Sequence, residues 1–175
     1  MPNSSIGERK LKVGIISDTH DNLPLVDKAI ERLNRERVKI VLHAGDYIAP
    51  FTVARFKQLE AKLIGVFGNN DGDHELLKKR FADIEAAEIR GNFAEVKADG
   101  LKIALLHGGE EELFQSLVNI ECYDVVVYGH SHEARTYKKG KTTVVNPGEV
   151  CGYLSGKSTI ALLDTVTREA KIVQL

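Results

Sequence analysis

The stretch LKVGIISDTHDN, residues 11–22, sets a pattern that the first half of the chain repeats. Its first seven residues are mostly apolar, which predicts a buried strand, and Asp18 and His20 follow where that strand ends. The same order of apolar strand and polar end recurs in VKIVLHAGD (38–46) and KLIGVFGNND (62–71). Helices are expected between and after these strands, over residues 22–37, 49–59 and 73–82. Strands that alternate with helices predict a parallel sheet with right-handed crossovers.

The second half of the chain is predicted to contain more strands and fewer helices. Gly91 and Asn92 indicate a hairpin, and the closely spaced last strands indicate antiparallel pairing. The expected elements are a helix over 110–119 and strands over 86–90, 93–98, 101–107, 123–130, 133–138, 142–146, 157–164 and 168–174. The fold class is therefore α/β, with two packed mixed sheets flanked by helices. We expect a single domain over residues 10–175 and a loosely held segment over residues 1–9.

Composition limits the class of protein. The 175 residues are 43% hydrophobic and 28% charged, which suits one core of ordinary size. No apolar run reaches the roughly 18 residues of a membrane span, and the polar N-terminus MPNSSIGERK does not resemble a signal peptide. Scattered basic residues and a net charge of −1 disfavour binding of duplex nucleic acid. Cys122 and Cys151 are expected to be buried thiols of a cytoplasmic protein.

Side chains able to bind a metal ion follow five of the predicted strands, at the edge where α/β sheets place their chemistry. They are Asp18 and His20, His43 and Asp46, Asn69 to Asp71, His107, and His130 and His132. Alone, each has a simpler interpretation as a helix cap, a structural histidine or a turn residue. A polar side chain that is buried without a partner lowers the stability of the fold by about 1–3 kcal/mol. A metal cluster shared by all of these side chains therefore explains them together. In an extended segment, residues two apart point to the same side, so each Asp–His or His–His pair is expected to face the cluster.

Five short motifs, taken in order, resemble those of the calcineurin-like metallophosphoesterases. The family pattern D-x-H, G-D, G-N-H/C-D/E, H-G and G-H-x-H is similar to Asp18–His20, Gly45–Asp46, Gly68–Asp71, His107–Gly108 and Gly129–His132. The match spans residues 13–148. The short chain, the HAGD sequence and the later NPG resemble the small bacterial and archaeal phosphodiesterase branch, which shares its fold with the retromer scaffold subunit. The resemblance implies a four-layer α-β-β-α sandwich.

The same resemblance implies hydrolysis of small phosphodiesters by a bridging hydroxide at a two-metal site. It assigns one ion to Asp18, His20 and His132, a second to Asn69, His107 and His130, and a bridging position to Asp46. The implied ions are divalent transition metals, with Mn²⁺ or Ni²⁺ favoured and Co²⁺, Fe²⁺ and Zn²⁺ also suited to these ligands. The expected catalytic residues are Asp46, Asn70 and Asp71, with Asp71 orienting a histidine or a water. The family also implies a homo-oligomer.

Asn70 departs from the family pattern, because many relatives carry a histidine there that protonates the leaving group. An amide donates a hydrogen bond but delivers no proton, so a general-acid contribution of about 10²–10⁴ is expected to be missing unless His74 or a metal-bound water replaces it. Glu149 is a second departure, at a position where relatives often have a small polar residue. Three alternatives stay open: a non-catalytic scaffold of the same fold, a phosphomonoesterase, and a nuclease or nucleotide pyrophosphatase.

Overall fold

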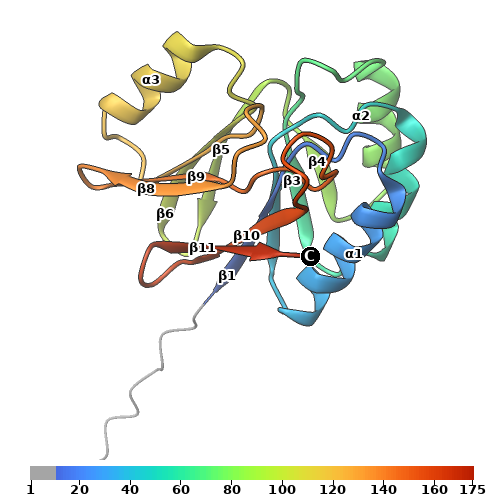
Figure 1. Ribbon diagram of the computed structural model, residues 1–175, viewed down its shortest axis with the longest axis horizontal. Coiled ribbons are helices and arrows are strands. Elements are labelled where there is room, and N and C mark those ends of the chain that lie inside the picture. The colour runs from blue at the N-terminus through green and yellow to red at the C-terminus, as the bar shows by residue number, and fades with distance from the viewer. Residues whose placement is uncertain (1–10) are drawn as a thin grey trace, which may run out of the picture.

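The computed structural model describes residues 11–175, so the N-terminal segment expected to be loosely held lies outside the described residues (Figure 1). In chain order its elements are β1 (Lys12–Ile16), α1 (Leu23–Arg35), β2 (Ile40–His43), the 3₁₀ helix η1 (Pro50–Gln58), β3 (Lys62–Gly65), α2 (His74–Ala82), β4 (Ala87–Ile89), β5 (Phe93–Ala98), β6 (Leu101–Leu106), α3 (Glu111–Asn119), β7 (Val125–Val127), β8 (Arg135–Lys139), β9 (Thr142–Asn146), β10 (Thr159–Asp164) and β11 (Glu169–Gln174). No helix among these is long and apolar enough to cross a bilayer.

The strands form two mixed sheets. The first has the order β11-β10-β1-β2-β3-β4, in which β1 to β4 are parallel neighbours and β10 pairs with β1 in the antiparallel sense. The second has the order β5-β6-β7-β9-β8, with a parallel centre of β6, β7 and β9 and antiparallel edges. The parallel strands of each sheet direct their C-terminal ends, and the loops that follow them, to one edge.

Three apolar clusters hold the sheets and helices in four layers (Figure 1). Ile15 and Ile103 belong to the cluster between the two sheets. Leu33 and Phe81 belong to the cluster between the first sheet and its helices, and Phe114 attaches α3 to the outer face of the second sheet. Alternate residues of a strand face opposite sides, so strands buried on both faces are apolar at nearly every position. The predicted α/β sandwich of two mixed sheets with flanking helices is confirmed.

The hairpin predicted over residues 86–98 is wrong. β4 pairs in parallel with β3 in the first sheet, whereas β5 pairs with β6 in the second. The turn at Gly91 and Asn92 therefore carries the chain from one sheet to the other, and the Gly91 carbonyl accepts a hydrogen bond from the backbone N–H of Phe67. A turn signal in the sequence shows that the chain reverses, but tertiary packing decides which strand each arm joins.

Three further expectations need correction. The helix expected over residues 49–59 is a 3₁₀ helix, in which Val53 and Phe56, three residues apart, both face the core. The final strands are not all antiparallel, because the β8–β9 hairpin reverses the chain and leaves β9 parallel to β7. Cys122 is exposed rather than buried, since it lies in the loop that leads from α3 into β7, whereas Cys151 is buried.

Candidate metal centre

The loops after β1, β2, β3, β6 and β7 meet at one edge of the sandwich and bring the candidate ligands together. Five of the seven candidates have positive φ values, a backbone conformation that is uncommon outside glycine: Asp18, His20, Asp46, His130 and His132. Such conformations persist where surrounding contacts enforce them, and they cluster at functional sites. The extended geometry expected for the Asp18–His20 and His130–His132 pairs is therefore wrong, although each residue still faces the cluster.

One group of candidate ligands surrounds Asp18. Nε2 of His132 lies 3.4 Å from Oδ1 of Asp18, and Nε2 of His20 lies 3.7 Å from the same oxygen. Nε2 of His20 also lies 3.3 Å from Oδ2 of Asp46. The ligand atoms of Asp18, His20 and Asp46 all lie within 4.8 Å of one another, a spacing at which a single ion can contact all three.

A second group surrounds Asn69. Its Oδ1 atom lies 2.8 Å from Nε2 of His107 and 3.0 Å from Nδ1 of His130. Nε2 of His107 lies 3.5 Å from Oδ2 of Asp46. The same oxygen of Asp46 thus faces His20 of the first group and His107 of the second, and this places Asp46 between the two groups.

Hydrogen bonds at the far side of two imidazole rings fix their tautomers. Nδ1 of His107 lies 2.8 Å from the carbonyl oxygen of Ala44, and Nδ1 of His132 lies 2.6 Å from Oε2 of Glu149. A carbonyl or a carboxylate only accepts, so each Nδ1 carries the proton and donates. The lone pair of each Nε2 is then directed at the cluster, as a metal ligand requires.

The donor set fits a cation. Oδ1 of Asp18 and Nε2 of His20 are buried and form no hydrogen bond of good geometry with any described residue. The nearby carboxylates of Asp18 and Asp46 raise the pKa of His20 to about 9, against the opposing effect of burial. Burial would raise the pKa of Asp46, but the close approach of His20 and the charge of His107 lower it overall. Two carboxylates that attract a proton to this point also attract a metal ion.

Glu149 is the site residue whose role sequence reasoning missed. Its side chain is fully buried and accepts hydrogen bonds from Nδ1 of His132, Sγ of Cys151, and the backbone N–H groups of Tyr153 and Leu154. Burial alone would raise the pKa of Glu149, but the hydrogen bonds from His132, Cys151 and Ser155 lower it to about 2. Burial and the contact with Glu149 raise the pKa of the Cys151 thiol to about 12, so the thiol donates to the carboxylate. The sequence signal was the departure of Glu149 from the family pattern, which gave no role for the residue.

Asn70 and Asp71 both support the loop that carries Asp46. The side-chain amide of Asn70 donates to Oδ2 of Asp46 at 2.8 Å, and its backbone N–H donates to Oδ1 at 2.9 Å. The buried carboxylate of Asp71 accepts from the backbone N–H groups of Asp46, Tyr47, Ile48 and Gly68. Burial raises the pKa of Asp71 against the effect of these donors. Asp71 therefore orients backbone, rather than the histidine or water that the sequence suggested.

Two other histidines lie outside the cluster. His43 is fully buried, stacks on Tyr47 with ring centroids 3.9 Å apart, and accepts from the backbone N–H of Gly45. Burial lowers the pKa of His43 to about 3, so it is a neutral core residue. His74 is exposed at the start of α2, and its ring stacks on Phe67 with centroids 4.0 Å apart.

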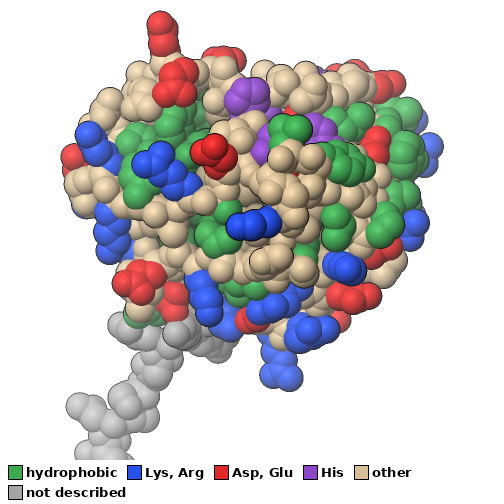
Figure 2. Space-filling view, in the orientation of Figure 1, with side chains coloured by type: hydrophobic (Ala, Val, Ile, Leu, Met, Phe, Trp, Pro, Cys, Tyr) green, Lys and Arg blue, Asp and Glu red, His purple; other side chains and the backbone are tan. Residues whose placement is uncertain are grey.

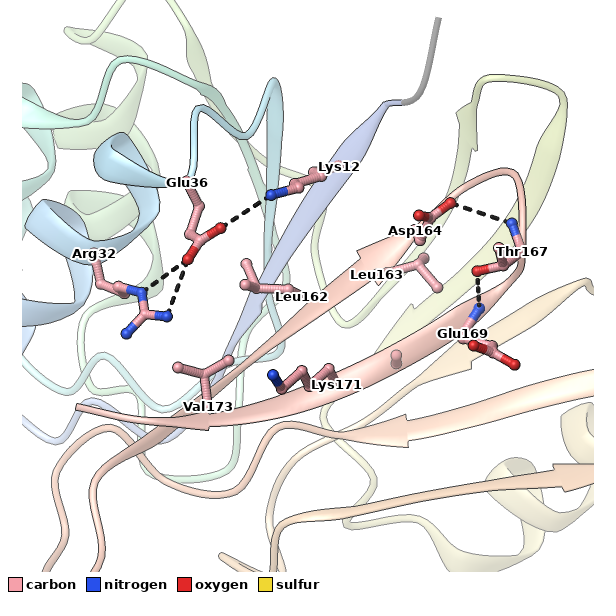
Figure 3. A pocket seen from close by; sticks show the side chains of 11 residues that line it. Lys12, Arg32, Glu36, Leu162, Leu163, Asp164, Thr167, Glu169, Lys171 and Val173 are labelled. Carbon is pink, nitrogen blue, oxygen red and sulfur yellow. Dashed lines mark hydrogen bonds and ion pairs between the residues drawn. The ribbon is translucent and has the colours of Figure 1, made fainter. Parts of the chain in front are cut away.

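One cavity on the described surface adjoins the cluster. It has a volume of about 710 Å³ and is lined in part by Asn69, His107 and His130. Figure 2 shows histidine side chains gathered at the top of the molecule beside hydrophobic ones. Another cavity, of about 470 Å³, lies between α1 and β10–β11 (Figure 3). Within it, Glu36 accepts hydrogen bonds from both Lys12 and Arg32.

Comparison with known proteins places the chain in a family. A family model described as the calcineurin-like phosphoesterase superfamily domain matches residues 11–168. Phosphodiesterase MJ0936 of Methanocaldococcus jannaschii is 42% identical over 94% of this chain and 99% of its own length. A solved structure of an archaeal phosphodiesterase, also 42% identical, superimposes with a TM-score of 0.90 and covers 94% of this chain and all of its own.

More distant relatives share the fold. Phosphodiesterase YfcE of Escherichia coli is 26% identical over 80% of this chain and 79% of its own length. The structure of Vps29 from Chaetomium thermophilum is 16% identical, covers 94% of this chain and 96% of its own, and superimposes with a TM-score of 0.69. At that identity the likeness to Vps29 concerns the fold alone. The family match covers nearly all of the described residues, and the chain belongs to the calcineurin-like phosphoesterase superfamily.

Proposed function

We propose that the protein is a metal-dependent phosphodiesterase that hydrolyses small phosphodiesters at a two-metal centre. The observation that carries the proposal is the position of Asp46, whose Oδ2 atom lies 3.3 Å from Nε2 of His20 and 3.5 Å from Nε2 of His107. A carboxylate oxygen that faces two separate groups of donors suits a ligand shared by two ions. The named phosphodiesterase relatives support the same reaction class.

The residues fall into the two sets that such a centre requires. Asp18, His20 and His132 would hold one ion, Asn69, His107 and His130 would hold the other, and Asp46 would contact both. Imidazole, carboxylate and amide donors suit divalent transition metals, and we propose Mn²⁺ or Ni²⁺, with Co²⁺, Fe²⁺ and Zn²⁺ as alternatives. When bound, a pair of such ions lowers the pKa of a water and stabilises charge on phosphoryl oxygens.

The charges of the chain favour a diester over a monoester. Asp18 and Asp46 are the two carboxylates within the cluster, and the amide of Asn69 contributes no charge. Against two dications they leave a net charge of about +2, and an anionic nucleophile reduces this to about +1. A diester monoanion neutralises that remainder, whereas a monoester dianion exceeds it.

The supporting residues hold this arrangement in place. Glu149 fixes the tautomer of His132, and the Ala44 carbonyl fixes that of His107. Asn70 donates to Asp46 and therefore positions a ligand instead of protonating a leaving group. The leaving group then departs best when it is a weak base, and this favours aryl esters over alkyl esters.

Further parts of the proposal concern the setting of the enzyme. We propose that residues 10–175 act as one domain, which the family match over residues 11–168 supports. Cys122 and Cys151 form no disulfide, in keeping with work in the cytoplasm. Family resemblance favours a homo-oligomer, and analytical ultracentrifugation of the purified chain measures its state. A scaffold is the less favoured function, because a protein that only binds partners has no need of seven assembled donors.

The test is hydrolysis of bis(p-nitrophenyl) phosphate and p-nitrophenyl phosphate by metal-stripped protein to which one metal at a time is restored. We expect metal-dependent cleavage, faster for the diester, that Asp46→Asn abolishes. Asp83→Asn serves as a matched control, because Asp83 is an exposed residue at the end of α2. Absence of turnover with every metal, in protein shown to bind two ions, would refute the enzyme assignment and favour a scaffold.

A further inference from the structure

The cavity beside the cluster extends well past the candidate ligands. Asn69, His107 and His130 line it, and so do the apolar side chains of Phe67, Phe93, Leu106 and Leu113 together with His74. Its volume of about 710 Å³ is in the range of sites that bind small organic molecules. A phosphate bound at the cluster would therefore have this cavity directly next to it.

Some of the apolar lining is left open to solvent, since Phe93 and Leu113 are exposed, whereas Phe67 and Leu106 are buried. The rings of Phe67 and His74 stack with an interplanar angle of 2°. Phe93 is 36% exposed and Leu113 is 40% exposed, which are high values for large apolar side chains beside a polar centre. Aromatic rings pack well against planar groups in offset-stacked or edge-to-face arrangements. These surfaces suit a ring better than a flexible polar chain.

The charges around the cavity disfavour a second phosphate. Within the described chain, no lysine or arginine lines it. Two carboxylates do, but that of Asp71 is buried and occupied by backbone N–H groups, and Glu110 is left as the exposed charge. Glu110 begins α3 without forming a side-chain cap hydrogen bond, so its carboxylate is not engaged by the helix. An anionic extension of the substrate would be repelled here, whereas a neutral or cationic group would not.

We propose that this cavity binds the organic group of the ester, and that it selects a planar, uncharged or cationic group over a second phosphate. The inference rests on the proposed function for the location of the phosphate. It adds the chemical class of the organic group that is bonded to that phosphate. It sets nucleotide pyrophosphates, whose neighbouring phosphate would face Glu110, apart from the diesters that the cavity accepts.

The test measures binding instead of turnover. Titration calorimetry of Mn²⁺-loaded protein compares phenylphosphonate with methylphosphonate, which share the anionic group and differ in the ring. We expect the ring to tighten binding by about tenfold. Phe93→Ser and Leu113→Ser should each reduce that preference by about threefold. Ile120→Ser is the matched control, because Ile120 is 65% exposed at the end of α3 and does not line the cavity.

A second arm tests the charge selection. 4-Carboxyphenylphosphonate adds one negative charge to the ring, and we expect it to bind more weakly than phenylphosphonate in the natural protein and to recover in Glu110→Gln. Equal binding of the phenyl and methyl compounds, or a preference that survives both Phe93→Ser and Leu113→Ser, would overturn the inference. Hydrolysis of bis(p-nitrophenyl) phosphate by the same preparations reports separately on the proposed function, which can stand when the cavity assignment fails.

Discussion

Replacement of Glu149 by glutamine tests whether the buried carboxylate orients a metal ligand. Oε2 of Glu149 accepts from Nδ1 of His132 at 2.6 Å, and Oε1 accepts from Oγ of Ser155 at 2.7 Å and from the backbone N–H of Leu154 at 3.0 Å. Glutamine keeps the shape but replaces one acceptor oxygen with an NH₂ group. If the NH₂ faces His132, Nδ1 must accept, and the proton moves to Nε2, which then cannot bind metal. If the NH₂ faces Leu154 and Ser155, it meets their backbone N–H groups, which are also donors, so those hydrogen bonds are lost.

Either orientation of the glutamine is expected to lower the affinity for one metal ion and to leave the affinity for the other unchanged. Loss of a partner that orients a histidine ligand typically costs 10–100-fold in metal affinity, which corresponds to about 1.4–2.7 kcal/mol. The effect should fall on the ion held by His132, because Asn69, His107 and His130 have no contact with Glu149. Competition with a chromophoric chelator, which resolves the two dissociation constants, measures this split.

Two controls separate orientation from a general loss of structure. Glu133→Gln removes the same charge from an exposed residue next to His132 and should leave both affinities unchanged. Urea unfolding of the metal-free variant reports any loss of stability from the loop that Glu149 holds. Two unchanged dissociation constants in Glu149→Gln would refute the reasoning, and equal weakening of both ions would show that the residue acts only through stability.

Three further predictions address the loops, the core and the leaving group. Gly45→Ala should lower the free energy of unfolding and weaken metal binding, because a Cβ there would lie 2.6 Å from the backbone nitrogen of Gly68. The control is Gly100→Ala, where φ is also positive but the space is open, so only the backbone strain of roughly 1–3 kcal/mol is expected. Equal urea midpoints for the two variants would contradict this prediction. Burial holds the pKa of His43 at about 3, so below about pH 6.5 the unfolded state binds one more proton than the folded state. The free energy of unfolding should therefore fall as the pH is lowered from about 6.5 to about 3, by at most about 1.4 kcal/mol per pH unit. In His43→Gln, the free energy of unfolding measured with urea should depend less steeply on pH. Asn70→Ala should weaken metal binding, because its amide bonds Asp46, yet leave the ratio of alkyl to aryl diester hydrolysis unchanged; a selective fall in the alkyl rate would show that the amide assists the leaving group.

The sequence predicted the parts of the centre that depend on local order. Each candidate ligand directly follows an apolar strand, and parallel strands in one sheet bring their C-terminal ends to the same edge. Asp18, Asp46 and Asn69 could therefore be grouped from the first sheet alone. His107 and His130 follow strands of the second sheet, and the cost of burying so many unpaired polar side chains at strand ends indicated that they join the same site. The five motifs in order then assigned each residue its place.

Pairing between distant segments was predicted less well. The turn at Gly91 was recognised, but the destination of β4 is set by its parallel register with β3, in which Leu63 faces Ala87. No residue within the turn carries that information. The positive φ values of the ligand loops have the same origin, since backbone N–H groups of residues 18–21 donate to the carbonyls of Gly45, Asp46 and Tyr47, and these bonds between loops impose the conformation.

Glu149 shows why a supporting residue is harder to find than a ligand. A ligand must belong to a small set of residue types and must lie at a strand end, so its position in the sequence is informative. The partner of His132 needs only an acceptor oxygen at Nδ1, which a carboxylate or a carbonyl from any segment can supply, as the Ala44 carbonyl does for His107. Burying a carboxylate for this role requires several donors to offset its desolvation, and residues 151–155 fold around Glu149 to provide them. No local pattern in the sequence reveals that this carboxylate is buried. Because burying a carboxylate is costly, we expect that it serves the metal centre through His132 and does not only hold its own loop.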